Sequence, residues 1–296
     1  MSFLILIIGF ALLIKGADVF VEGASSIAKK FNVPSMIIGL TIVAMGTSAP
    51  EAAVSVTSSL AGQNDMSVAN VVGSNFFNVL VVLGVSSIIA KLPVQEETIK
   101  KDTPFLILVS ILLLVFGINL KLGRIEGLAL LGLFTYFLVN TIKSAKKATE
   151  DDSLETGETA IAIETQTSSE ISLPKTILVS IVGIVGIVLG GDMVVNSAIS
   201  IATSLGMSAN LVGLIIVAVG TSLPEFVTSI VAIKKGETEI AIGNVIGSNL
   251  FNILLVLGLA AVINPISMSM LAFIDIIFMV LITLLLYMFM KKKASR

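Results

Sequence analysis

The sequence predicts an all-α integral membrane protein built from two inverted repeats of transmembrane helices, and three observations carry this prediction. Of the 296 residues, 55% are hydrophobic and 13% are charged, and the mean hydropathy is +1.05, whereas soluble domains carry roughly 25% charged residues. Apolar runs of about 20 residues, the length that crosses a bilayer, recur along the chain. Two polar motifs inside these runs occur twice, 174 residues apart, as from Glu51 to Glu225.

Nine apolar segments are long enough to span a membrane. The first begins close to Met1, with no basic region and no small-residue cleavage site, so we interpret it as a membrane helix rather than a removed signal peptide. The nine predicted spans are approximately 3–28, 34–60, 67–90, 103–120, 124–142, 174–203, 208–233, 238–263 and 268–290.

One connection differs from the others in composition. The segment 144–173 is rich in Asp, Glu, Ser and Thr and lacks aromatic residues, so it is predicted to be a flexible acidic linker. It separates a first transmembrane repeat, 1–143, from a second, 174–296. Basic residues favour cytoplasmic loops. An outside N-terminus and a cytoplasmic linker place nearly all of the 18 Lys and Arg residues inside, with Lys121 and Arg124 outside.

The repeat determines the predicted architecture. Residues 39–51 read GLTIVAMGTSAPE and residues 213–225 read GLIIVAVGTSLPE, with ten of thirteen positions identical, and residues 71–84 and 245–258 share ten of fourteen. Five predicted spans precede the linker. Because five is odd, the second copy enters the membrane in the opposite direction to the first. Inverted repeats with interrupted helices near the midplane are typical of secondary transporters.

The first repeated motif places oxygen ligands inside an apolar run. Pro50 cannot donate a helical hydrogen bond and should leave nearby carbonyl oxygens under-used, while Thr47 and Ser48 add hydroxyl oxygens. Glu51 lies one turn after Thr47 on the same side of the helix, and an ionisable group within a membrane is expected to be functional. The second copy supplies the equivalent Thr221, Ser222 and Glu225.

The second repeated motif adds hydroxyl and amide oxygens that share a helix face, because the two residues are four positions apart. The two pairs are Ser74 with Asn78 and Ser248 with Asn252. Asn75 and Asn249 face elsewhere and are interpreted as packing or capping groups. With two carboxylates, and no Cys or His in the chain, the donor set suits Ca²⁺ or Na⁺ rather than a softer metal.

Structural roles would also explain a single copy of either motif. Ser, Thr and Pro occur in kinked membrane helices, and Ser and Asn form contacts between helices. Two copies with a Glu in each favour a cation site instead. Asp18 can pair with Lys15 along the first helix, which we interpret as a structural contact. Asp192 and Asp275 have no evident partner in the sequence and are not assigned to the site.

These motifs resemble the two α-repeats of the calcium/cation antiporter superfamily, most closely the sodium/calcium exchanger branch of prokaryotic type, over nearly the whole chain. The resemblance implies ten helices in two inverted halves and four central cation sites, and the tenth helix has no counterpart among the nine predicted spans. The ligands it implies are Ala44 (carbonyl), Thr47, Ser48, Glu51, Ser74, Asn78, Ala218 (carbonyl), Thr221, Ser222, Glu225, Ser248 and Asn252. The two alanines enter only through this resemblance. Asn at both 78 and 252 resembles potassium-independent members.

The predicted function is that of a secondary antiporter that exchanges Na⁺ for Ca²⁺ by alternating access, with the glycine-rich first and sixth helices sliding over the rest. Proton-coupled calcium antiport and a cation channel are the alternatives. No enzyme activity is expected, because no nucleophile–base pair stands out. Ca²⁺ and Na⁺ are expected as transported substrates and not as cofactors. The other predicted partner is the lipid bilayer of the cell membrane, with no nucleic acid, and the chain is predicted to be a monomer.

Overall fold

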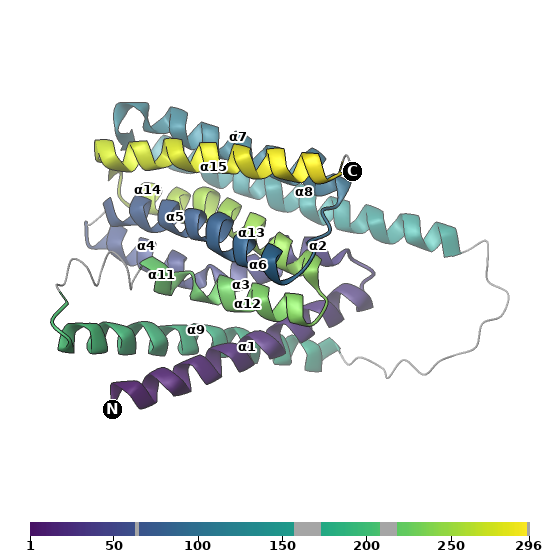
Figure 1. Cartoon of the computed structure of the whole chain (residues 1–296). Helices are drawn as coiled ribbons and strands as arrows, with labels where there is room; N and C mark the ends of the chain where they lie inside the picture. Colours follow the sequence, from purple (N-terminus) through teal and green to yellow (C-terminus); the bar gives the residue numbers. More distant parts are fainter. Residues whose placement is uncertain (63–64, 157–172, 208–217, 295–296) are drawn as a thin grey trace.

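Helices that run along one common direction make up most of the structure, a computed structural model that describes residues 1–62, 65–156, 173–207 and 218–294 (Figure 1). Seven of the described helices are long and apolar enough to cross a membrane, and the bent pair Ser35–Thr47 and Ala49–Leu60 makes an eighth candidate. The described β structure is one antiparallel pair, β1 (Lys121–Leu122) with β2 (Ile266–Ser267). The protein is therefore an all-α, multi-pass membrane protein.

The elements follow the order expected from the apolar runs, with short π-helical turns (η1, η2, η3 and η6) and one 3-10 turn (η4) between α-helices. Those of the first half are α1 (Ser2–Lys30), α2 (Ser35–Ile38), η1 (Gly39–Val43), α3 (Ala44–Thr47), α4 (Ala49–Leu60), α5 (Asp65–Phe76), η2 (Phe77–Val82), α6 (Leu83–Ile89), η3 (Thr98–Asp102), α7 (Thr103–Phe116), η4 (Gly117–Asn119) and α8 (Arg124–Thr156). Those of the second half are α9 (Leu173–Ser204), α11 (Ala218–Thr221), α12 (Leu223–Lys234), α13 (Thr238–Phe251), η6 (Asn252–Leu257), α14 (Gly258–Ile263) and α15 (Met270–Ala294).

The two halves run through the bundle in opposite directions. Helix α1 starts at the left of Figure 1 and runs to the right, whereas α9, the first helix of the second half, starts at the right and runs back. The close approaches agree with this, because Gly9 lies against Val194 while Gly16, further along α1, lies against Ile187. The second repeat is therefore inverted relative to the first, as the odd number of predicted spans requires.

Glycine lets α1 and α9 touch backbone to backbone. A Cβ added at Gly16 would lie 2.7 Å from the backbone nitrogen of Ile187, and one added at Gly190 would lie 2.5 Å from the backbone nitrogen of Leu13. No methyl group fits into such spaces, and small residues at a crossing allow membrane helices to pack closely. The two helices form one antiparallel pair along a side of the bundle (Figure 1).

The interrupted helix of the first half packs on α13, the central helix of the second half. Residues 240–251 of α13 are buried without exception. Two glycines of α13 make the approach possible: an added Cβ would lie 2.6 Å from the carbonyl oxygen of Met36 at Gly243, and 2.5 Å from that of Leu40 at Gly247. The repeated motifs of the two halves are thus brought together across the repeat boundary.

Both repeated motifs interrupt regular helix. Ser48 separates α3 from α4 at a bend of 47°, and Ser222 separates α11 from α12. Pro50 and Pro224 lie in the first turn of the following helix, where the missing N–H leaves no hydrogen bond unmade. A π-helical turn then carries each second-motif asparagine, in η2 and η6. Such turns are frequent at functional sites, and the apolar pattern did not predict them.

Two expectations need adjustment. Nine spans were predicted, whereas seven span-length helices and one bent pair are found within the described residues, and the predicted span 208–233 lies partly outside them. Helix α8 continues to Thr156, past the predicted start of the linker at 144. Good helix formers (Ala, Lys and Glu) occupy five of the six positions 145–150, which favours the extension. Residues 157–172 of the predicted linker lie outside the described part of the chain.

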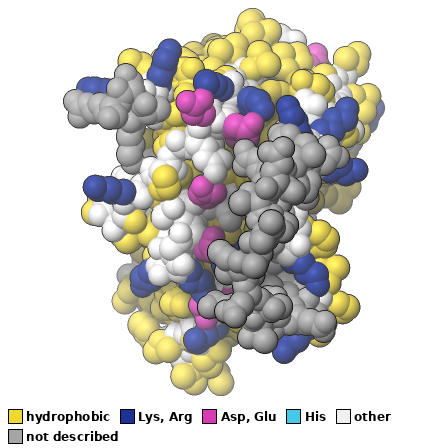
Figure 2. Space-filling view, turned by 90° about the vertical axis from the view of Figure 1, so that its right-hand side faces the viewer, with side chains coloured by type: hydrophobic (Ala, Val, Ile, Leu, Met, Phe, Trp, Pro, Cys, Tyr) yellow, Lys and Arg dark blue, Asp and Glu magenta, His cyan; other side chains and the backbone are white. Residues whose placement is uncertain are grey.

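Charged residues gather at one end of the bundle, which faces the viewer in Figure 2. Helix α1 ends there with Lys29 and Lys30, α12 ends there with Lys234, and α9 begins there with Lys175. This end is termed the lysine-rich end. These four lysines lie at the same end of the bundle, and the side of the membrane that this end faces stays a prediction.

Replacing Gly16 by Ala is expected to push α1 away from α9, because the added Cβ would lie 2.7 Å from a backbone nitrogen. Overpacking of this kind costs about 1–3 kcal/mol, so the midpoint of thermal unfolding in detergent should fall. Gly132→Ala on α8 is the matched control, since nothing lies within 4 Å of its added Cβ and Ala is the better helix former. Equal midpoints for the two variants would contradict the tight crossing.

Candidate cation site

The predicted ligands of both halves meet inside the bundle, on helices that lie between α1 and α15 in Figure 1. Ala44, Thr47, Ser48, Glu51, Ser74, Asn78, Ser222, Glu225, Ser248 and Asn252 are 0–1% exposed, and Thr221 is 7% exposed. Ala218 is the first residue of α11. Polar side chains so deeply buried require partners, and the hydrogen bonds among them define the site.

Each glutamate accepts hydrogen bonds from a serine of its own half and a serine of the other half. Ser74 and Ser222 donate to Oε1 of Glu51 over 3.2 Å and 3.4 Å. The equivalent bonds, in the same order, run to Oε1 of Glu225 from Ser248 (3.4 Å) and Ser48 (2.9 Å). The cluster therefore repeats the two-fold relation of the sequence, and neither half forms it alone.

Four buried oxygen atoms of this cluster have no hydrogen-bond partner in the described structure. They are Oε2 of Glu51, Oε2 of Glu225, Oδ1 of Asn78 and Oδ1 of Asn252. An unsatisfied buried polar atom costs about 1–3 kcal/mol, and native structures contain few of them. These four form two symmetry-related pairs, and every one is an oxygen. A cation, which accepts lone pairs from oxygen, is the kind of partner that each of them lacks.

Among the residues that the structure describes, no basic side chain pairs with either carboxylate. The ion pairs found among the described residues involve other acids, and neither Glu51 nor Glu225 takes part in one. A buried carboxylate without a counter-charge is strongly unfavourable. Carboxylate, hydroxyl and amide oxygens with a net negative charge are the ligands of hard cations such as Ca²⁺. The arrangement therefore has the chemistry of a cation site.

Asn75 and Asn249 orient the amides of the site. Nδ2 of Asn78 donates to Oδ1 of Asn249 over 3.1 Å, and Nδ2 of Asn252 donates to Oδ1 of Asn75 over the same distance. Because each amide nitrogen is engaged, the amide oxygen on the other side remains available. The interpretation of Asn75 and Asn249 as packing or capping groups is therefore incomplete, since they also hold two predicted ligands across the repeat boundary.

A further pair, Asn70 and Asn244, was missed in the sequence. Nδ2 of Asn70 donates to the carbonyl oxygen of Glu51 over 3.3 Å and to Oγ of Ser55 over 3.0 Å. The equivalent bonds run from Asn244 to Glu225 (3.3 Å) and Ser229 (3.0 Å). These asparagines hold the turn that follows each helix break.

The same asparagines also connect the halves. Oδ1 of Asn244 accepts a hydrogen bond from Thr47 over 3.0 Å, and Oδ1 of Asn70 accepts one from Thr221 over 3.4 Å. Each asparagine thus joins a glutamate turn of its own half to a threonine of the other. A signal for this existed, because Asn70 and Asn244 stand at equivalent positions of the repeat, three residues before its Gly-Ser-Asn motif.

The predicted carbonyl ligand Ala44 is engaged within its own helix. Its oxygen accepts the backbone N–H of Ser48 over 3.0 Å and the hydroxyl of Thr47 over 3.3 Å. The Thr47 hydroxyl also lies 3.4 Å from the Ser248 hydroxyl. The structure therefore buries the predicted side-chain ligands together, and their roles as ligands stay predictions, as do those of the two alanine carbonyls.

Comparisons with known proteins identify the family. The family model described as sodium/calcium exchanger protein matches residues 1–143 and 175–296. The chain belongs to the sodium/calcium exchanger family. The sodium/calcium exchanger MaX1 of Methanosarcina acetivorans is 33% identical over 97% of this chain and 91% of its own length. CaxA of Alkalimonas amylolytica is 43% identical over 88% of this chain and 80% of its own.

Solved structures of exchangers share the fold. The sodium-calcium exchanger NCX_Mj is 31% identical, superimposes with a TM-score of 0.84, and aligns over 98% of this chain and 90% of its own. The predicted membership of the calcium/cation antiporter superfamily is thereby confirmed, as is the assignment as a cation exchanger rather than an enzyme. The individual ligands of this exchanger and its orientation in the membrane stay predictions.

Changing Asn70 to Ala should weaken cation binding without removing a ligand, because it releases the Glu51 turn. Residues that orient ligands typically contribute 10–100-fold in affinity, so the cation concentration for half-maximal exchange should rise at least about tenfold. Tracer exchange in proteoliposomes measures it. Asn140→Ala, on the exposed surface of α8, is the control. The same half-maximal concentration in both variants would show that Asn70 does not position the site.

Proposed function

We propose that the protein exchanges Na⁺ for Ca²⁺ at this cluster. The observation that carries the proposal is the set of four unpartnered buried oxygens on Glu51, Glu225, Asn78 and Asn252. Two carboxylates supply two negative charges, which one Ca²⁺ balances, and the surrounding hydroxyl and amide oxygens approach the six to eight ligands that Ca²⁺ takes. MaX1 and NCX_Mj, both named sodium/calcium exchangers, support the choice of ions.

Competition for shared oxygens couples the two ions. Na⁺ ions occupy the oxygens that Ca²⁺ leaves, and the cluster cannot hold both cargoes at once. An empty cluster would keep two carboxylates buried without a counter-charge, which costs several kcal/mol per ion. The empty protein therefore does not switch readily between the states open to either side of the membrane. The Ca²⁺-loaded and Na⁺-loaded forms do switch. Exchange, rather than one-way flux, follows from this difference.

Access alternates through movement of the α1–α9 pair over the helices that carry the ligands. A Cβ added at Gly46 would lie 3.1 Å from the ring of Phe20 on α1, and one added at Gly220 would lie 2.3 Å from the side chain of Val195 on α9. The pair therefore packs on the turn before each helix break. With the N-terminus outside and the lysine-rich end in the cytoplasm, sliding of this pair would open the cluster to one side at a time.

An outward Na⁺ gradient is expected to drive ⁴⁵Ca²⁺ into proteoliposomes, because Na⁺ leaving the lumen must be replaced by Ca²⁺ at the same oxygens. Vesicles loaded with K⁺ instead of Na⁺ are the control. Uptake that follows a proton gradient and ignores Na⁺ would replace the proposal with proton-coupled antiport. Uptake without any counter-ion would indicate a channel.

Glu51→Gln and Glu225→Gln are each expected to abolish this uptake, since each removes half of the charge that balances Ca²⁺. Losing one partner of a buried charge pair costs about 3–5 kcal/mol, which corresponds to a decrease of at least about 100-fold in the rate at limiting Ca²⁺. Glu97→Gln is the matched control, because Glu97 is exposed and pairs with Lys101 away from the cluster. Normal uptake in both site variants would place the cation site elsewhere.

A further inference from the structure

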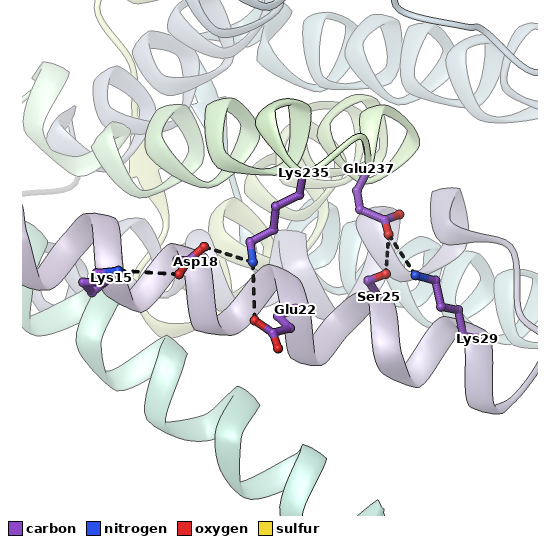
Figure 3. Close-up of polar contacts among 7 residues, drawn as sticks. All are labelled: Lys15, Asp18, Glu22, Ser25, Lys29, Lys235 and Glu237. Atoms are coloured by element: carbon purple, nitrogen blue, oxygen red, sulfur yellow. Dashed lines mark hydrogen bonds and ion pairs between the residues drawn. The ribbon is translucent and has the colours of Figure 1, made fainter. Parts of the chain in front are cut away.

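A second charged cluster, outside the cation site, joins α1 to the turn between α12 and α13 (Figure 3). Lys235 lies in this turn and places its Nζ 2.9 Å from Oδ1 of Asp18 and 3.4 Å from Oε2 of Glu22. The predicted contact of Lys15 with Asp18 is present as well, but it is longer, at 3.9 Å. The stronger partner of Asp18 thus comes from the other half of the protein.

Glu237 extends the cluster at the other side of the turn. Its Oε1 accepts a hydrogen bond from Ser25 and lies 3.6 Å from Nζ of Lys29, both on α1. Its Oε2 lies 3.5 Å from the donating hydroxyl of Ser35, where α2 begins. The turn is therefore attached to α1 and also to the start of the interrupted helix. Lys15, Asp18, Glu22, Ser25, Lys29, Lys235 and Glu237 are termed the ladder.

The α1 residues of the ladder are three or four positions apart and therefore form one stripe along the helix. Read from Lys15 to Lys29, the stripe is positive, negative, negative, neutral and positive. Figure 3 shows Lys235 reaching between the two acids, with Glu237 beside Ser25 and Lys29 further along the helix. The order of charges on α1 thus matches the order of charges on the turn at the observed position.

Sliding α1 changes this match unequally in its two directions. A shift of one turn, about 5.4 Å, toward the lysine-rich end would bring Lys15 to Lys235 and Glu22 to Glu237, which are like-charge contacts. Asp18 would then take the place of Glu22 beside Lys235, so one attraction would remain against two new repulsions. The same shift in the opposite direction would keep Glu22 with Lys235 and Lys29 near Glu237, and would release Asp18 and Ser25 from their present partners. The ladder therefore accommodates two positions of α1 and opposes a third.

The inverted repeat does not reproduce the ladder. The counterpart of Asp18 is Asp192 on α9, 174 residues later, but the counterpart of Lys235 is Ala61. Asp192 forms no ion pair with any residue that the structure describes. The equivalent site of the second repeat, at Asp192, folds without this contact. Helix packing therefore does not require the ladder. It marks one end of the molecule only.

We infer that Lys235 is a positioning residue, which sets the register of the α1–α9 pair and changes acidic partners when the pair slides. The inference rests on the alternating access proposed above. The side chains of Lys235, Asp18 and Glu22 are 28%, 40% and 70% exposed, and exposed ion pairs shift an equilibrium by only roughly two- to fivefold each. Such contacts bias the position of α1 and still break rapidly.

Crosslinking tests whether α1 must leave Lys235. The chain contains no cysteine, so Asp18→Cys with Lys235→Cys can be bridged by a bifunctional methanethiosulfonate. Exchange should stop in the bridged protein and return when dithiothreitol cleaves the bridge. Glu96→Cys with Lys100→Cys, an i,i+4 pair within one segment, is the control and should exchange at an unchanged rate. Full exchange by the bridged Asp18→Cys, Lys235→Cys protein would overturn the inference.

This experiment separates the inference from the proposed function. Na⁺-driven Ca²⁺ uptake is measured first in the unmodified protein and in the double variant before bridging. No uptake in the unmodified protein defeats the proposed function, irrespective of the ladder. Uptake that survives bridging defeats the ladder and leaves the proposed function intact.

A distance measurement tests the ladder without transport. Spin labels are attached at Ile14→Cys on α1 and at Lys234→Cys on α12. The distance between the labels, measured by pulsed electron paramagnetic resonance, reports the position of α1 along the bundle. A second population about one helical turn, 5.4 Å, longer is expected, and Lys235→Gln should change its share at least roughly twofold. Lys235→Arg, which retains the charge, should restore the original shares. An identical distribution in the Lys235→Gln protein would overturn the inference.

Discussion

Two buried carboxylates that pair with no basic side chain in the described part of the chain determine which groups must surround them. Glu51 and Glu225 are fully buried, and each has one oxygen engaged by serine and one left open. Such a pair persists within an apolar bundle only if the surroundings stabilise its charge. The helix breaks at Ser48 and Ser222 bring hydroxyl groups to the carboxylates, and both serines reach the glutamate of the other half. The site is therefore a product of the association of the halves.

The association in turn depends on residues with no charge at all. Gly243 and Gly247 let the first interrupted helix lie against α13. Asn70 and Asn244 then hold each glutamate turn from behind. The two residue types have different roles. Glycine has no side chain to keep the helices apart, whereas the asparagine amides donate and accept hydrogen bonds and so satisfy backbone and side-chain groups that have no access to water. Each contact crosses or supports the repeat boundary.

Much of the fold and of the site could be predicted from the sequence, for identifiable reasons. The fold class followed from apolar run length. The residues of the buried polar cluster followed from a motif that appears twice inside apolar runs, and their role as ligands stays a prediction. The spacing of Ser74 and Asn78 also predicted a shared helix face. What could not be predicted depends on contacts between the halves: the bonds of Ser48 to Glu225, the orientation of Asn78 by Asn249, and the pairing of Lys235 with Asp18. The repeat spacing of 174 residues shows which positions of the two halves are equivalent. It does not show which residues of one half contact the other.

The glycine-lined crossing of α1 and α9 has a consequence for how well an ion gradient is conserved. Backbones in direct contact at Gly16 and Gly190 leave no layer of side chains that could deform independently. The two helices therefore share one degree of freedom, and in the proposed mechanism each acts as the gate for a different side of the membrane. In that mechanism, opening the cluster to one side would close it to the other. A continuous pore would dissipate the gradient, and it could form only if α1 and α9 separated at their glycine-lined contact.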